Sequence, residues 1–401
     1  MSNLPSIDVS DATLFEEDNQ WDLFARLRAE DPVHFCEESH YGPYWSITKF
    51  VDIKWIDSHH DLFSSDRDVT IFDQPDDFEL PMFIAMDKPK HHHQRKVVSP
   101  VVAPRNLAEL EGTIRQRVKT ILDSLPGGEV FNWVDKVSIE LTTQMLALLL
   151  DFPFEDRHKL TRWSDVASGG RLSGVVDSAT HRRKELYECL EYFQDLWQKK
   201  SNAAPANDLI SMLAHGKSTQ DMPPMEYLGN IVLLVVGGND TTRNTITGGV
   251  LALNQFPDEF EKLKDRPELI PNMASEIIRW QTPLSHMRRT ATADVEIRGK
   301  TIKKGDKVIM WYISGNRDED QFPDANRLII DRHNARSHVS FGYGIHRCMG
   351  NRLAEMQIRV LWEEILTRFD DIKVVGEPVR VRSNLIKGYS ELPVEVFRKT
   401  A

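Results

Sequence analysis

The sequence is poor in cysteine: its 401 residues include only Cys36, Cys189 and Cys348. An odd number of cysteines at such wide spacing excludes a disulfide framework and a zinc site made from paired cysteines. A lone cysteine is usually a small buried hydrophobic residue, and we interpret Cys36 and Cys189 in this way. Cys348 lies in a glycine-rich segment, so it requires a different explanation.

Long hydrophobic runs and clusters of positive charge are also missing. The longest strongly apolar stretch, residues 231–236, is about a third of the roughly 20 residues needed to cross a bilayer. The first residues are polar and acidic, and they resemble neither a signal peptide nor an anchor. The formal net charge is -11 and the Lys and Arg residues are scattered. We therefore expect a cytoplasmic protein with no nucleic-acid partner and no membrane anchor.

No linker, low-complexity segment or repeat of fixed period divides the chain, so we expect a single domain over residues 1–401. Apolar residues spaced three and four apart predict helices through most of the sequence, and the protein should be mainly α. The predicted helices cover residues 21–30, 107–125, 133–150, 181–200, 224–254, 259–265, 268–280 and 349–368.

Strand-like segments are short and predict only small β-sheets beside this helical body. They cluster near residues 33–53 and over residues 295–312, where Gly299 and Gly305 would form the turns of a hairpin. A late pair of segments, residues 372–375 and 394–397, would add edge strands.

Cys348 lies in the segment FGYGIHRCMG, residues 341–350, directly before a predicted amphipathic helix. Unpaired N–H groups and the dipole at a helix N-terminus stabilise a thiolate, so Cys348 is placed to be an anion. The glycines allow a tight bend or the close approach of a flat cofactor, and His346 adds a hydrogen-bond donor near the sulfur. The pattern indicates a site for a planar metal macrocycle.

This decamer resembles the haem-binding signature of the cytochromes P-450 and matches it at Phe341, Gly344, His346, Cys348 and Gly350. The resemblance implies the cytochrome P-450 fold, a triangular prism of helices around a buried haem b (iron protoporphyrin IX). It makes Cys348 the iron ligand, whose thiolate favours O–O cleavage. Phe341 and Gly350, together with Gly237 of the predicted central helix, would then be in contact with the haem.

The predicted central helix contains a polar block, GGNDTT at residues 237–242, after a fully apolar stretch. Thr241 is four residues beyond Gly237, so its hydroxyl can bond the Gly237 carbonyl, loosen the helix and make room for dioxygen and water. The block resembles the acid–alcohol pair of the same family, which implies that Asp240 and Thr241 relay protons. It lacks the lysine of a phosphate loop, so a nucleotide site is disfavoured.

A further family motif concerns structure rather than chemistry. Glu276 and Arg279 are three residues apart on one helical face and can form an ion pair. Together with Arg327 they resemble the structural Glu-Arg-Arg cluster of the family.

Three adjacent histidines, residues 91–93, suggest a metal site, but their side chains point in different directions on a helix and cannot all bind one ion. His91 and Arg95 do share a helical face, because they are four residues apart. The family resemblance implies that they anchor the haem propionates together with Arg289 and His346.

At a finer level GGNDTTRN, HMRRTA and QRKVVSPVVAP resemble the bacterial branch that hydroxylates alkanes and fatty acids at the terminal carbon. The implied reaction uses O2 and electrons from NADH, which pass through a ferredoxin reductase and a 2Fe–2S ferredoxin. The chain itself has no dinucleotide motif and too few cysteines for a cluster. Lys96, Arg347 and Arg352 would offer positive charge to an acidic ferredoxin.

An apolar pocket over the haem should select an apolar small-molecule substrate. Its predicted lining consists of Leu233, Val236 and Gly237 on the central helix, residues 284–287 with Leu284 and Met287, and residues 386–389 with Ile386. Three alternatives stay open: a hydroxylase of terpenoid, aromatic or heterocyclic substrates, a peroxide-driven or isomerising member of the family, and a haem protein that only senses gas or carries electrons. The acid–alcohol pair favours oxygen activation.

Overall fold

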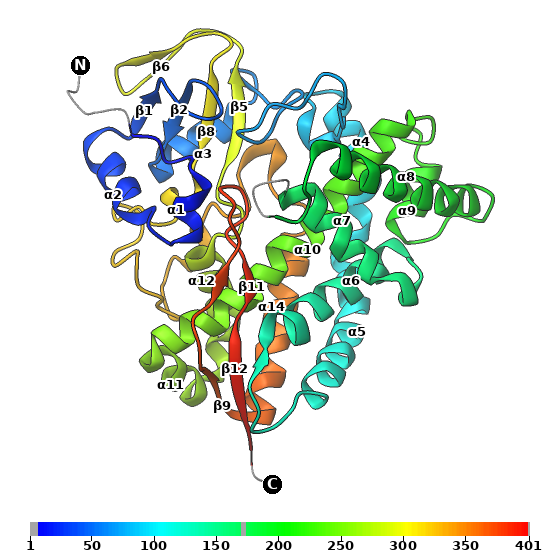
Figure 1. Cartoon of the computed structure of the whole chain (residues 1–401), viewed down its shortest axis with the longest axis vertical. Helices are drawn as coiled ribbons and strands as arrows, with labels where there is room; N and C mark the ends of the chain where they lie inside the picture. Colours follow the sequence, from blue (N-terminus) through cyan, green and yellow to red (C-terminus); the bar gives the residue numbers. More distant parts are fainter. Residues whose placement is uncertain (1–6, 170–173, 400–401) are drawn as a thin grey trace.

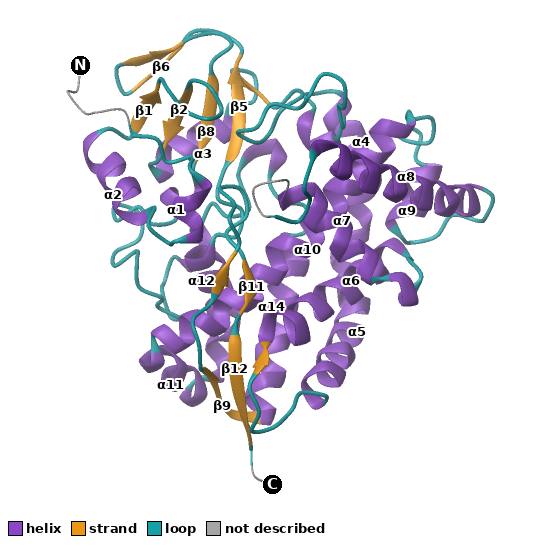
Figure 2. Cartoon of the chain, viewed as in Figure 1, coloured by secondary structure: helices purple, strands orange, loops and turns teal. Residues whose placement is uncertain are grey.

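The computed structural model of the chain describes residues 7–169 and 174–399 (Figure 1). Helices form most of the body. One group of strands lies on the side of the molecule where the N-terminus is, and another runs toward the C-terminus (Figure 2). Within the described ranges, no helix combines the length and the apolar character needed to cross a membrane.

The body is organised around α10 (Pro224–Gln255), a helix of 32 residues. Most of its residues are buried, because other helices pack against several of its sides. These neighbours include α6 (Glu140–Leu150), α7 (His158–Gly169), α12 (Ile270–Gln281) and α14 (Asn351–Arg368). A helix that is enclosed in this way can hold polar residues in fixed positions inside the protein.

All the predicted helical segments are helical, although two of them begin with a different helix type. Residues 134–139 form a π-helical turn before α6, and residues 267–269 form a 3₁₀ turn before α12. Several further helices were not predicted, and most of these are short: α1 (Ala12–Glu16), α3 (Phe50–Ser58), α4 (Lys90–Val98), α7, α9 (Leu209–His215) and α13 (Tyr312–Gly315).

The other predicted helices are α2 (Trp21–Glu30), α5 (Pro104–Asp123), α8 (Ala179–Ser201) and α11 (Pro257–Asp265).

The larger sheet has the strand order β1-β2-β8-β5-β3. Only its β2–β8 pair is parallel, and this pair joins two segments that lie far apart in the sequence. The bounds of its strands are β1 (Val33–Cys36), β2 (Tyr44–Ile47), β3 (Phe63–Ser64), β5 (Met287–Ala291) and β8 (Lys307–Met310).

Residues 50–53, which we predicted as strand, open helix α3 instead, so the prediction is wrong there. Phe50 and Ile53 are buried on the same side of this helix. The N–H of Phe50 donates to a carboxylate oxygen of Asp318 at 2.9 Å. A residue distant in the sequence therefore caps the helix, and no local pattern could indicate that contact.

The predicted hairpin with Gly299 and Gly305 at its turns is only partly confirmed. β6 (Val295–Ile297) and β7 (Lys300–Ile302) pair around Gly299, which has a φ of +72°. After Gly305, with a φ of +90°, the chain leaves the hairpin and β8 joins the larger sheet. Both glycines adopt the left-handed conformation that other residues disfavour.

The late pair of strands is confirmed: β9 (Phe369–Val374) and β12 (Pro393–Arg398) are antiparallel. β4 (Phe131–Asn132) pairs with the other edge of β12. A separate two-stranded sheet consists of β10 (Val379–Arg380) and β11 (Tyr389–Glu391).

The buried ion cluster contains a different arginine from the one that we predicted. Glu276 accepts from Arg279 at 2.8 Å, and both side chains are fully buried. The third member is Arg332, whose Nε donates to Glu276 at 3.0 Å. The side chain of Arg327 instead pairs with Asp258 at the surface, and only its backbone carbonyl accepts from Arg279. The prediction for Arg327 is wrong because the chain turns its side chain outward.

This correction predicts different effects on stability for two arginine substitutions. Arg332→Ala should lower the free energy of unfolding by about 3 kcal/mol, because it removes one partner of a buried carboxylate. Arg327→Ala should lower it by less than about 1 kcal/mol, since an exposed ion pair contributes little. Denaturant unfolding of the two variants measures the difference. Equal losses would contradict the assignment.

Candidate active site

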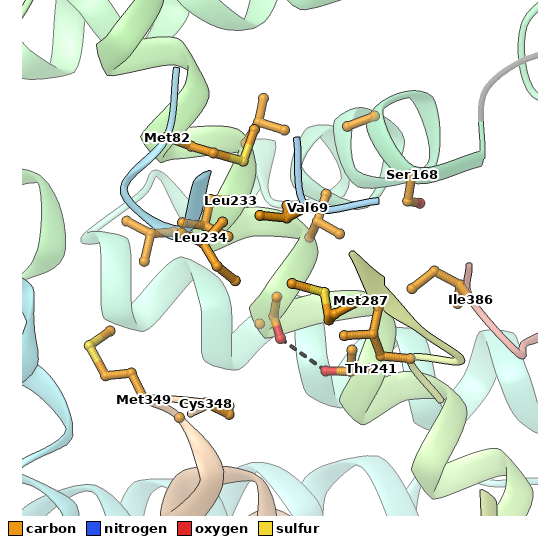
Figure 3. A pocket seen from close by; sticks show the side chains of 18 of the residues that line it. Val69, Met82, Ser168, Leu233, Leu234, Thr241, Met287, Cys348, Met349 and Ile386 are labelled. Atoms are coloured by element: carbon orange, nitrogen blue, oxygen red, sulfur yellow. Dashed lines mark hydrogen bonds between the residues drawn. The ribbon is translucent and has the colours of Figure 1, made fainter. Parts of the chain in front are cut away.

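A cavity of about 570 Å³ lies between α10, the end of α7 and the loop that precedes α14. Figure 3 shows mainly apolar side chains around it, among them Val69, Met82 and Leu234. The pocket residues that were predicted individually lie on its wall, but residues 285, 286 and 387–389 of the two predicted ranges do not. The predicted residues on the wall are Leu233, Val236, Gly237, Leu284, Met287 and Ile386.

Cys348 lines this cavity from the loop before α14, and its side chain is exposed to the cavity inside the protein rather than packed against core residues. Its N–H donates to the carbonyl of Phe341 at 2.7 Å, which closes the bend. Burial raises the pKa of the Cys348 thiol. The N–H groups of Gly350 and Asn351 and the charge of Arg95 oppose that rise. The donors expected at the start of the helix are therefore directed at the sulfur.

The bend depends on glycine at two positions. Gly342 and Gly344 have φ values of +64° and +65°. A Cβ atom on Gly344 would lie 2.2 Å from the carbonyl oxygen of Asp57, so no larger residue fits there. Gly350 and Phe341 also line the cavity.

His91 and His346 meet beside the cavity, with their ring centroids 4.1 Å apart. Both side chains are buried, and no ring nitrogen of either has a hydrogen-bond partner among the described residues. Burial, together with nearby arginine charges, lowers the pKa of His91 to about 4 and that of His346 to about 2. Buried polar atoms without partners are rare in proteins, so these nitrogens indicate a ligand.

Arg95 and Arg289 add positive charge to the same wall. Arg289 is buried and pairs with Asp57 at 2.8 Å. Arg95 donates to the carbonyl of Arg347, the residue before the cysteine. His91 itself lies behind His346 rather than on the cavity surface, whereas the neighbouring histidines of α4 are exposed. The described residues contain no group of three or more acidic, cysteine or histidine side chains that could hold a metal ion.

These residues fit a haem. The sulfur of Cys348 would ligate the iron. The unpartnered imidazoles and the arginines would donate hydrogen bonds to the carboxylates of the haem. The side chains that the sequence predicted for haem binding therefore lie close together in the fold. Asp57, which holds Arg289, was missed because nothing in its local sequence distinguishes it.

Thr241 and Gly237 are arranged as predicted. The hydroxyl of Thr241 donates to the carbonyl of Gly237 at 3.0 Å, and Figure 3 shows this bond at the edge of the cavity. A Cβ atom on Gly237 would meet no atom within 4 Å, so this side of α10 is open. The helix thus leaves free space next to a hydroxyl group.

The carboxylate of Asp240 lies against α7 rather than on the cavity wall. This carboxylate is fully buried and accepts from the hydroxyl groups of Ser164 at 2.8 Å and Ser168 at 2.5 Å. Arg243 lies 3.1 Å from the same carboxylate. Ser168 lines the cavity, whereas Asp240 does not. Sequence reasoning missed both serines because it did not predict α7.

Comparisons with known proteins agree with this geometry. The family model for cytochrome P-450 matches residues 264–380. Linalool 8-monooxygenase of Pseudomonas putida is 35% identical over 98% of this chain and 99% of its own length. A methyl-branched lipid omega-hydroxylase of Mycobacterium bovis is 32% identical over 97% of this chain and 96% of its own. The solved structure of CYP153D17 from Sphingomonas sp. PAMC 26605 is 50% identical, covers 98% of this chain and 99% of that chain, and has a TM-score of 0.92.

Replacing the cysteine tests the assignment of the ligand. Cys348→Ala should abolish the red-shifted absorption band that thiolate ligation gives to the reduced, carbon monoxide-bound protein, because no other described side chain places a sulfur anion there. Cys189→Ala is the matched control, since Cys189 is buried in the apolar core. A spectrum that is unchanged in Cys348→Ala would refute the site.

Proposed function

The chain belongs to the cytochrome P-450 family of haem-iron monooxygenases, and on this basis we propose that it hydroxylates unactivated C–H bonds of apolar substrates, mainly at the terminal carbon of medium-chain alkanes or fatty acids. The observation that carries the proposal is the apolar cavity that opens onto Cys348. The similarity to a lipid omega-hydroxylase supports terminal attack on an aliphatic chain.

Haem b, when bound, supplies the activation of dioxygen. The protein contributes the surroundings: Cys348 would provide an anionic ligand, while His346, Arg95 and Arg289, with His91 against His346, would hold the carboxylates. The apolar wall binds the substrate and excludes water from it.

In this proposal Thr241 and Asp240 transfer protons to the site of dioxygen activation. The Thr241 hydroxyl holds a proton at the cavity edge through its bond to the Gly237 carbonyl. Asp240 supplies protons from the side of α10 that faces α7, and the hydroxyl of Ser168 is its link to the cavity. Arg243, which also pairs with partly exposed Asp165 at 2.9 Å, keeps the carboxylate in place.

Electrons would come from NADH through a ferredoxin reductase and a 2Fe–2S ferredoxin. Lys96, Arg347 and Arg352 are exposed, and the charges of Arg347 and Arg352 act on Glu355. Exposed positive charges close to Cys348 suit an acidic electron donor.

A second candidate function is hydroxylation of a terpenoid. The 35% identity to linalool 8-monooxygenase favours it. A compact branched substrate and a straight chain would both find apolar contacts in this cavity.

Product analysis separates the two candidates. The holoenzyme with ferredoxin, reductase and NADH should convert medium-chain alkanes and fatty acids mainly to terminal alcohols, because the chain end is the part of the substrate presented to Cys348. Linalool serves as the comparison substrate. Hydroxylation mainly at internal carbons, or turnover of linalool alone, would overturn the proposal.

A substitution on α10 tests the proton step. Thr241→Ala should keep haem binding but lower the product formed per NADH by about 10-fold or more, with hydrogen peroxide formed instead, because a proton donor is lost. Thr241→Ser keeps the hydroxyl and should retain most of the coupling. Unchanged coupling in Thr241→Ala would contradict the relay.

A further inference from the structure

Arg182 is a cationic residue on the wall of the cavity that the proposed reaction does not use. It lies in the first turns of α8, where its Nε donates to the carbonyl of Val166 and its Nη2 to that of Ala167, both at 3.2 Å. These carbonyls belong to the end of α7, which also places Ser168 on the wall. Figure 3 shows Ser168 and Cys348 at opposite sides of the pocket. Arg182 therefore belongs to the side remote from the cysteine.

The charge of Arg182 is not balanced by an acid. Within residues 7–169 and 174–399 it makes no ion pair. Burial lowers the pKa of Arg182, the charge of Arg183 lowers it further, and no acidic group opposes them. The neighbouring basic residues all have acidic partners: His181 with Asp177 at 3.1 Å, Arg183 with Asp77 at 2.6 Å, and Lys184 with Glu188 at 3.9 Å.

The acids on the cavity wall are already paired with other cations. Asp73 bonds Arg288 at 2.5 Å and Lys307 at 3.1 Å, and Asp68 lies 3.8 Å from Arg288. None of them compensates Arg182. A partly desolvated guanidinium without an anion is unfavourable, and its planar set of donors suits a carboxylate.

The other two arginines of the cavity differ in both place and partner. Arg289 is paired with Asp57, and Arg95 donates to the carbonyl next to Cys348. Both therefore belong to the cysteine side of the cavity. Of the three arginines among the described residues that line the cavity, Arg182 is the one whose hydrogen-bond partners are all carbonyls of α7.

We infer that Arg182 binds the carboxylate of an aliphatic acid whose chain runs along the apolar wall toward Cys348. The inference rests on the proposed function and refines it: the preferred substrate is a fatty acid rather than an alkane. With the acid group held at Arg182, the end of the chain remote from the carboxylate is the part that reaches the cysteine side. Apolar residues such as Leu233 and Met287 contact the chain between the two ends.

Matched ligands test the inference in the holoenzyme. Dodecanoate, its methyl ester and dodecane are titrated against the change in haem absorption that substrate binding causes. Arg182→Gln should raise the Kd of dodecanoate by about 10- to 100-fold, as expected for loss of a charge-assisted hydrogen bond. The Kd values of the ester and the alkane should change by less than about 2-fold, since neither carries a charge.

Two further variants separate binding from folding. Arg183→Gln removes the adjacent arginine, which is paired with Asp77, and should leave all three Kd values unchanged. Arg182→Lys keeps the charge but not the planar fork, so it should give a Kd for dodecanoate between those of the wild type and Arg182→Gln. It also provides the measurement if Arg182→Gln does not fold.

The outcomes distinguish this inference from the proposed function. Equal weakening of all three ligands, with a lower melting temperature, would mean that Arg182 only caps α7, and would overturn the inference. A second outcome has two parts: the wild type hydroxylates dodecane at the terminal carbon, and the Arg182 variants bind dodecanoate as tightly as the wild type does. This outcome would overturn the inference about Arg182 but would leave the proposed function standing. If the wild type neither binds nor hydroxylates any of the three, both proposals fail.

Discussion

The buried carboxylate of Asp57 is the interaction on which the geometry of the site depends. It accepts from Arg289 at 2.8 Å, from the hydroxyl of Tyr312 at 2.7 Å and from the N–H of Tyr343 at 2.9 Å. Burial raises the pKa of this carboxyl, and the charge of Arg289 opposes that rise. One anion thus joins the sheet to the glycine-rich loop, so the position of Cys348 and the orientation of a wall arginine are set together.

The cavity built on this anchor differs in chemistry between its two sides. Near Cys348 it has arginines and the imidazole of His346, which fit the carboxylates of a haem, while the opposite side has a hydroxyl and an unbalanced guanidinium. Apolar residues of α10 and of the surrounding loops separate them. In the proposed arrangement, different charges would hold the haem and a substrate with one polar end, and the apolar part between them would favour an aliphatic chain.

Several features could be predicted because they depend on residues close together in the sequence. The bond between Thr241 and Gly237 follows from a spacing of four in a helix, and the bend at Cys348 follows from its glycines. One error and one omission arose where distant segments meet. Arg332 rather than Arg327 reaches Glu276, and the Asp240 carboxylate bonds serines of a helix that the sequence pattern did not indicate.

The sequence by itself determined the helical character of the chain, the cysteine at a helix start and the family to which these motifs belong, because local spacing and residue type specify them. Only the tertiary structure decided which arginine completes the buried cluster, which serine connects Asp240 to the cavity, and which cation of the wall lacks an anion. Each of these depends on contacts between residues far apart in the chain, and charge balance in a cavity exists only once those residues have been brought together.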